Sequence, residues 1–158
     1  VLVGVRLDRR ARQERRQPDP LTVKPGRPDA VVSLDHVVIN TANPERAVAF
    51  YGGRLGLRLA LDRANPDWDM RLLFFRTGAL TIELAHRISA GVGKQPDKLW
   101  GLSWRVPDVE AAHKRLEKAG LAVTPVRAGR RPGTRVFSVK DGTLNTPTLI
   151  LSAEPAGA

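Results

Sequence analysis

The alternation of apolar and polar positions predicts a strand, a helix and three further strands in the first half of the chain. Residues 34–40 (LDHVVIN) are rich in β-branched side chains, as a strand requires. Asn43-Pro44 suits a helix start, because asparagine caps well and proline fits the first helical position. An apolar stripe follows, and we expect the helix to end at Gly52-Gly53. The remaining strands are expected at residues 57–61, 71–76 and 80–85.

The same order recurs in the second half. Residues 102–106 predict a strand, Asp108 a helix cap and Gly120 the helix end. Further strands are expected at residues 122–126, 134–139 and 148–151.

The numbering of the two halves is related by a constant offset of 65. It joins the predicted caps Asn43 and Asp108, and it also joins the leucines of the last strands, Leu84 and Leu149. An offset held from the first strand to the last indicates an internal duplication. We therefore predict an α+β domain, residues 31–153, made of two tandem βαβββ modules at about 33–86 and 99–152.

Composition removes several classes of site. The chain has no cysteine, which excludes disulfides, thiolate metal sites and a cysteine nucleophile. No apolar run approaches the roughly 18 residues that span a bilayer, and residues 1–5 are too short for a signal peptide. We expect a soluble, cytoplasmic protein without membrane contact. Residues 1–30 are basic and proline-rich and predict a disordered arm, and residues 154–158 a short tail.

The net charge of +10 does not by itself indicate a nucleic-acid partner. Residues 1–29 carry +4 of it, and the basic residues of the body are scattered apart from four arginines near a Pro-Gly turn. No aromatic residue interleaves with that cluster in the sequence, as base stacking would require. We therefore do not expect nucleic-acid binding.

Candidate chemistry lies on the strand faces that point away from the helices. Side chains alternate along a strand, so His36, Val38 and Asn40 share one face of the first strand, and Glu83 lies on the same side of the last strand of its module. An imidazole and a carboxylate suit zinc, nickel, iron or manganese. The alternative is a structural histidine and a solvated glutamate, which are the commoner roles for such residues.

Several segments resemble the vicinal-oxygen-chelate superfamily, which includes glyoxalase I, bleomycin-resistance proteins, fosfomycin-resistance enzymes, methylmalonyl-CoA epimerases and extradiol dioxygenases. The resemblance covers about residues 33–152. It implies curved mixed sheets that enclose a cleft, and a homodimer. Its motifs are LDHVVIN (34–40), AVAFY (47–51), LGL (55–57), TIEL (81–84), RVPDV (105–109) and LEKAG (116–120).

The metal ligands of that family come from the first and last strands of both modules. His36 and Glu83 match the two positions of the first module, but the offset of 65 leads to Gly101 and Thr148 in the second, and neither is a normal ligand. His86 and His113 are poor substitutes. We expect His86 to face the other side of its strand and His113 to be exposed on a helix.

Two functions remain open, and a third ranks below them. The first is a glyoxalase-like lyase or isomerase that uses a divalent metal (zinc, nickel, manganese or iron) to act on a small oxygenated substrate, with Glu83 as ligand or base. The second is a metal-free small-molecule binding protein of the bleomycin-resistance type. Extradiol oxygenation is third, because the second-module ligands are missing. Asn40, Ser103 and Arg105 are the candidate substrate-binding residues.

Overall fold

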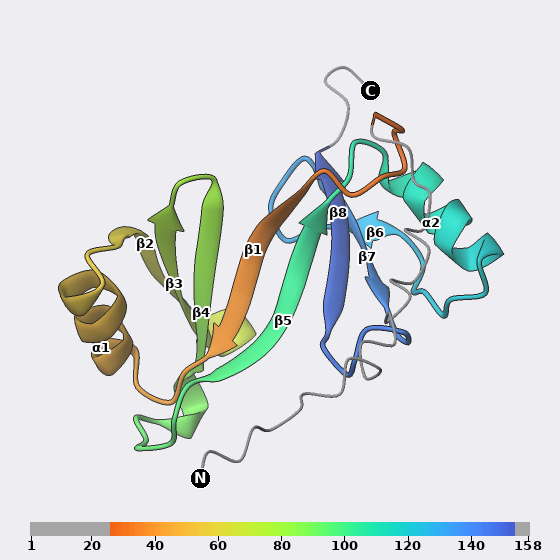
Figure 1. Ribbon diagram of the computed structural model, residues 1–158. Helices are drawn as coiled ribbons and strands as arrows, with labels where there is room; N and C mark the ends of the chain where they lie inside the picture. The colour runs from red at the N-terminus through yellow and green to blue at the C-terminus, as the bar shows by residue number, and fades with distance from the viewer. Residues whose placement is uncertain (1–25, 154–158) are drawn as a thin grey trace, which may run out of the picture.

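The computed structural model describes residues 26–153, which form one curved eight-stranded sheet with helices at its two ends (Figure 1). The strand order is β2-β3-β4-β1-β5-β8-β7-β6. Pairs β1–β4 and β5–β8 are parallel and the others antiparallel. This confirms the expected α+β class and mixed sheet. No helix among the described residues is long and apolar enough to cross a membrane.

Each module contributes one helix and four strands. The first contains β1 (Ser33–Asn40), α1 (Pro44–Ala47) with its π-helical continuation η2 (Val48–Arg54), β2 (Arg58–Asn65), β3 (Met70–Thr77) and β4 (Leu80–Arg87). The second contains β5 (Lys98–Arg105), α2 (Val109–Lys118), β6 (Arg127–Ala128), β7 (Thr134–Val139) and β8 (Thr148–Ala153). Two short 3-10 turns are η3 (Pro66–Trp68) and η4 (Ile88–Ala90).

The modules join through the antiparallel pair β1–β5, whose register confirms the offset of 65 at this place. Its central cross-strand pairs are Val37 with Leu102, His36 with Ser103, and Val38 with Gly101. Val37 and Leu102 are related by the offset and lie directly opposite each other. The two halves are therefore related by a local two-fold axis through this pair.

The helix starts also follow the duplication. Asn43 accepts a hydrogen bond from the backbone of Arg46 at 2.9 Å, and Asp108 accepts from two backbone amides of α2 at 3.0 Å. Ala47 and Ala112, which are related by the same offset, are both fully buried. Both predicted caps are confirmed.

The first helix ends later than expected. Helical structure passes through Gly52-Gly53 to Arg54, and Gly56 then takes a positive φ of 69°. Its amide donates to the carbonyl of Gly52 at 3.1 Å, which satisfies one of the last helical carbonyls. The left-handed residue that stops the helix is thus Gly56. In the second module Gly120, with φ of 83°, does the same as predicted.

The strand expected at residues 122–126 is wrong. Only one isolated bridge, between Val123 and Val139, forms there, and the paired segment is β6, Arg127–Ala128. Pro125 has no amide hydrogen, and the amide of Ser138 bonds instead to the side chain of Thr124 at 2.9 Å. Proline thus interrupts the ladder in the middle of the expected strand.

The last strand departs from the offset of 65. In the first module Ile82 lies beside Val37, whereas in the second Thr148 lies beside Leu102, the equivalent of Val37. Thr148 therefore corresponds to Ile82, and the offset in β8 is 66.

Burial agrees with this shift by a single position. Leu84 is fully buried in the first core, and the matching core residue of β8 is Ile150 rather than Leu149. The counterpart of Glu83 is therefore Leu149, and Thr148 lines a cavity beneath α2 on the other face. Leu84 and Leu149 therefore share a residue type but are not structurally equivalent.

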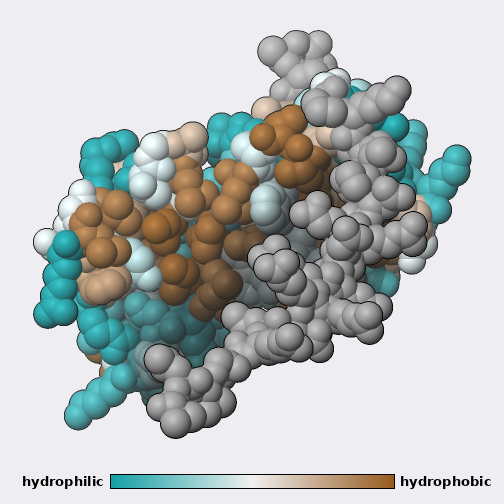
Figure 2. Space-filling view, in the orientation of Figure 1, coloured by the Kyte–Doolittle hydropathy of each residue, from teal (hydrophilic) through white to brown (hydrophobic). Residues whose placement is uncertain are grey.

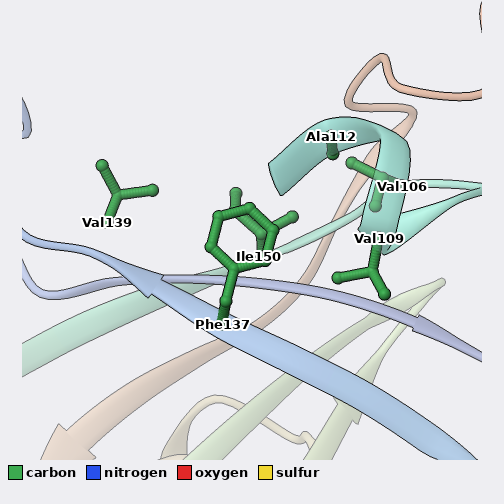
Figure 3. Packing of buried hydrophobic residues seen from close by; sticks show 6 residues of the cluster. All are labelled: Val106, Val109, Ala112, Phe137, Val139 and Ile150. Carbon is green, nitrogen blue, oxygen red and sulfur yellow. The ribbon is translucent and has the colours of Figure 1, made fainter. Parts of the chain in front are cut away.

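Each module has its own hydrophobic core between helix and sheet. The second contains Phe137, fully buried against α2 (Figure 3), and Trp104 packs at the margin of this core. The first is built around Leu73, Phe75 and Leu84. The full set in Figure 3 is Val106, Val109, Ala112, Phe137, Val139 and Ile150.

Apolar side chains also remain on the surface. In the view of Figure 2 they gather in a band from α1 across to the beginning of β1. Exposed large apolar side chains of the described residues include Phe50 and Leu55 near α1, and Leu59 and Leu61 in β2. Because β2 is an edge strand of the sheet, these leucines lie beside unpaired backbone groups.

Ordered contacts begin before the expected start at Val31. Asp29 and Ala30 are buried, and the carbonyl of Pro28 accepts the amide of Asp108 at 2.8 Å. Most of the predicted arm (1–25) and the predicted tail (154–158) lie outside the described residues.

Candidate active site on the open face of the first module

We call the sheet face opposite α1 and α2 the open face. His36 from β1 and Glu83 from β4 both lie on it, with Nε2 of His36 3.8 Å from Oε2 of Glu83. Their side chains are 19% and 14% exposed, so both are shielded from water but reachable. Apolar side chains surround them on the same face, among them Val38, Leu72 and Ala85.

A β-bulge brings Asp35 to the same place. Strict alternation would turn Asp35 away from its neighbour His36, but the pairing with β5 shifts between Leu34 and His36. The extra residue bends the strand locally. As a result, Nδ1 of His36 donates to Oδ2 of Asp35 at 2.8 Å. Arg105 donates from Nη2 to the other oxygen of that carboxylate.

Ser103 reaches the second nitrogen of the ring. It lies directly across from His36 in the β1–β5 pair, and its Oγ is 2.8 Å from Nε2. Ser103 is only 2% exposed. The three side chains form one continuous hydrogen-bonded series from Asp35 through His36 to Ser103, which we call the Asp–His–Ser chain.

The carboxylate at its start is strongly stabilised as an anion. The hydrogen bond from His36 lowers the pKa of Asp35 from 3.8 to about 2, and the Arg105 guanidinium adds to this against the opposing effect of burial. Asp35 is therefore ionised at neutral pH and can only accept hydrogen bonds. The hydrogen between Asp35 and His36 accordingly belongs to Nδ1.

Glu83 is in the opposite electrostatic situation. Burial raises the pKa of its carboxyl group above the ordinary 4.5, and the nearby charges of His36 and Arg130 only partly offset this. None of residues 26–153 donates a hydrogen bond to its carboxylate. A poorly solvated carboxylate beside an imidazole is a suitable group for accepting a proton.

The loop between β6 and β7 brings Arg130 to the margin of this site. Its guanidinium carbon lies 5.5 Å from the ring centroid of Trp68, which belongs to the turn between β2 and β3. The edge hairpins of the two modules therefore approach each other. No aromatic residue lies near Arg130 along the sequence. Trp68 is distant along the chain and comes close to Arg130 only in the folded structure.

The other candidate residues are distributed differently. Arg105 pairs with Asp35, and Asn40 stands at the far end of β1, where it lines a hollow of about 560 Å³ together with His86. His86 is buried and donates from Nδ1 to the carbonyl of Thr41 at 3.1 Å. His113 is half-buried rather than exposed, because its ring packs edge-on against Phe137 in the second core.

The residues of this site do not complete a metal ligand set. Among residues 26–153 no three histidine, cysteine, aspartate or glutamate side chains are grouped to hold an ion. The second-module counterparts are Gly101 and Leu149, which offer no donor atom. A Cβ at position 101 would lie 2.6 Å from the carbonyl oxygen of Pro147, so any side chain there would require the backbone to move.

Two kinds of similarity connect this arrangement with known proteins. An epimerase from Cereibacter sphaeroides, named ethylmalonyl-CoA/methylmalonyl-CoA epimerase, is 30% identical over 97 residues, which are 57% of this chain and 72% of that protein. Methylmalonyl-CoA epimerase from Mycobacterium tuberculosis has a TM-score of 0.64 at 24% identity, covering 79% of this chain and 90% of that one.

Other solved structures share the fold at lower identity. A hypothetical protein from Bacillus halodurans C-125 has a TM-score of 0.66 at 18% identity, over 80% of this chain and 97% of that one. A methylmalonyl-CoA epimerase variant from Streptomyces coelicolor, in complex with 2-nitronate-propionyl-CoA, has a TM-score of 0.63 at 18% identity, over 78% and 99%. Residues 35–137 match the family model described as Glyoxalase/Bleomycin resistance protein/Dioxygenase superfamily, and the chain belongs to this superfamily.

Proposed function

We propose that this protein is an isomerase-type enzyme that moves a proton at the carbon next to a carbonyl group of a small oxygenated substrate. Glu83 is the base. The observation that carries the proposal is the position of its carboxylate, on the open face and 3.8 Å from the fixed imidazole of His36.

The setting of Glu83 favours proton abstraction. Burial destabilises its anionic form, which makes the carboxylate a better proton acceptor than one in water. The apolar side chains Val38, Leu72 and Ala85 would limit competition by water around the reacting carbon. Arg130 supplies a positive charge at the margin, which favours the anion that forms when the carbon loses its proton.

The spacing of the two groups suggests transfer on a single face of the substrate. A base must come within about 3 Å of the proton it takes, so two groups on opposite faces of one carbon need roughly 6 Å between them. Glu83 and His36 are closer than this. We therefore expect the proton to leave and return on one side, as in a shift between neighbouring atoms, and not to cross the carbon plane.

The relatives support proton chemistry beside a carbonyl. The epimerases named above carry methylmalonyl-CoA or ethylmalonyl-CoA in their names, and an acyl thioester is therefore one substrate class to try, for which transfer on a single face predicts deuterium exchange without inversion. The metal-assisted version expected from the sequence finds only two of its donors here, His36 and Glu83, so the steps are assigned to the side chains alone. Extradiol oxygenation would need the same missing donors.

Deuterium exchange tests the proposal directly. The full chain is incubated in D₂O with methylmalonyl-CoA, ethylmalonyl-CoA and a set of small α-hydroxy ketones, and mass spectrometry follows deuterium at the carbon next to the carbonyl. We expect exchange with at least one class, lost by roughly 10²-fold or more in Glu83→Gln. The control Glu117→Gln alters an exposed glutamate of α2 and should exchange as the parent does. Equal exchange by Glu83→Gln would rule out Glu83 as the base.

A metal-free binding protein is the second candidate, favoured by the loss of donors at Gly101 and Leu149. In the same experiment it predicts that ligands are bound, as seen by a thermal shift, with no deuterium incorporated from any of them. That pair of results would replace the enzymatic proposal.

A further inference from the structure

The Asp–His–Ser chain occupies the position at which the family resemblance implies a metal ligand. His36 matches that ligand position, yet both of its ring nitrogens already have partners within 2.8 Å, Asp35 at Nδ1 and Ser103 at Nε2. A metal ion would have to bind at Nε2, because Nδ1 carries the hydrogen given to Asp35. The hydroxyl of Ser103 already occupies the hydrogen-bonding position at that nitrogen.

Backbone geometry fixes each member of the chain. The bulge between Leu34 and His36 turns Asp35 toward the ring, and Arg105 holds the far oxygen of that carboxylate. Ser103 is placed by the register of β5 opposite β1. Asp35 and Arg105 therefore set the orientation of the ring from one side while Ser103 sets it from the other.

The order of residues is that of a serine hydrolase, but the serine is not placed as a nucleophile. Ser103 is 2% exposed, and it lies within a paired strand instead of on an exposed turn. His36 and Glu83, whose side chains are 19% and 14% exposed, are more accessible than Ser103. His36 is therefore the group that the Asp–His–Ser chain holds in position at the site.

The geometry points to a metal-independent centre in which the Asp–His–Ser chain engages both ring nitrogens of His36, so that the hydrogen on Nε2 is shared between Oγ of Ser103 and the carbonyl oxygen of the substrate. This inference rests on the proposed function for its substrate. Asp35 and Ser103 are positioning residues, and His36 is the group that contacts the substrate oxygen.

Bonds and protons balance in the step, which begins with hydrogen on both ring nitrogens of His36. Glu83 takes the carbon-bound proton, so the C–H bond breaks and its electron pair forms the enol double bond. Nε2 of His36 gives its proton to the carbonyl oxygen, so an O–H bond forms and the imidazole becomes neutral. With an α-hydroxy ketone, neutral His36 then takes the proton of the neighbouring hydroxyl oxygen while Glu83 delivers its proton to the former carbonyl carbon, so the carbonyl group moves by one carbon and both residues regain their first states. No oxidant, reductant or further reactant is needed.

Metal content is the first test. The full chain is purified, reconstituted separately with Zn²⁺, Ni²⁺, Mn²⁺ and Co²⁺, passed through a desalting column and analysed by mass spectrometry. We expect far less than one ion per chain for each metal. One ion per chain in the parent, absent from His36→Ala, would overturn the inference.

The state of the ring is the second test, and it requires no activity. Nitrogen-15 spectra at mildly alkaline pH should show hydrogen on Nδ1 of His36, identified by its loss in His36→Gln. His86 donates from the same nitrogen and His113 from Nε2, so they serve as internal references. Asp35→Asn and Ser103→Ala should each change the His36 signals, whereas Ser152→Ala, a buried serine of β8, should not. A His36 ring with hydrogen on Nε2 and a free Nδ1 in the parent would contradict the inference.

Kinetics separate this inference from the function on which it rests. Once a substrate is identified by deuterium exchange, Asp35→Asn should lower kcat by roughly 10- to 100-fold with little change in KM. Ser103→Ala should lower it less, and Ser103→Thr, which keeps the hydroxyl, should recover activity. Exchange that disappears on chelation and returns with metal would overturn the metal-independent centre while leaving Glu83 as the base. Absence of exchange in the parent would remove the proposed function, and the metal and spectral results would then still decide the role of the chain.

Discussion

Replacing Asp35 with asparagine removes one charge from the Asp–His–Ser chain and changes little else in shape. In the folded protein this carboxylate accepts from His36 and pairs with Arg105. The amide of asparagine keeps one acceptor oxygen but loses the negative charge and turns an N–H group toward either His36 or Arg105, so the substitution removes the charge together with one of the two hydrogen bonds.

The pKa of Asp35 gives the magnitude. A pKa of about 2 in place of 3.8 corresponds to about 2.4 kcal/mol, at 1.36 kcal/mol for each tenfold change. Because the Arg105 side chain is 42% exposed and water screens the pair, we expect about 1–2 kcal/mol. This stabilisation is complete above pH 4, where Asp35 would be ionised even in the unfolded chain. It is lost as the pH falls toward 2, where the folded carboxyl takes up its proton.

Urea denaturation at a series of pH values between 7 and 2 measures the effect. The difference in unfolding free energy between the parent and Asp35→Asn should be largest at pH 7, at the screened magnitude given above, and should disappear near pH 2. Asp67→Asn, at an exposed position in η3, is the matched control and should leave the curve unchanged. A difference that stays constant down to pH 2 would show that charge is not the cause, and no difference at pH 7 would refute the contact itself.

Other substitutions test the scaffold by the same urea titrations. Gly101→Ala places a Cβ 2.6 Å from the carbonyl oxygen of Pro147 and should lower the unfolding free energy by about 1–3 kcal/mol. Gly53→Ala enters open space and should leave the unfolding free energy unchanged or raise it by up to about 1 kcal/mol. Equal changes in the two variants would contradict the crowding at Gly101. Phe137→Ala empties the centre of the second core and should cost about 3–5 kcal/mol, and a loss below about 1 kcal/mol would mean that the site is not packed as described. Asn43→Ala should cost about 1 kcal/mol through the lost cap, and an unchanged midpoint would argue against that hydrogen bond.

Much of the scaffold is readable from the sequence because its signals are local. Asn43 and Asp108 cap helices through their own side chains, and the alternation along β1 and β4 is enough to place His36 and Glu83 on one face. The shared residue types at an offset of 65 locate the seam between modules. These features depend on close neighbours along the chain, which a sequence displays directly.

The errors arise where pairing depends on distant or irregular backbone. The connection from β7 to β8 is longer than that from β3 to β4, and the register shifts by a single position, which moves the counterpart of Glu83 from Thr148 to Leu149. Alternation alone misses Asp35 because a bulge interrupts it, and no glycine marks that bulge. Ser103 is identified by its face, but its contact with His36 depends on the cross-strand register.

The second module contributes to the site through the β1–β5 pair, although its counterparts of His36 and Glu83 offer no donor atom that could bind a metal. Ser103 and Arg105, which belong to the second module, complete the hydrogen-bonding of His36 and Asp35 in the first. The two copies therefore contribute differently to the proposed site: the first carries the proposed reactive groups, and the second holds them in place. A selection that acts on the reactive groups would therefore also act on β5, and neither half would evolve as an independent unit.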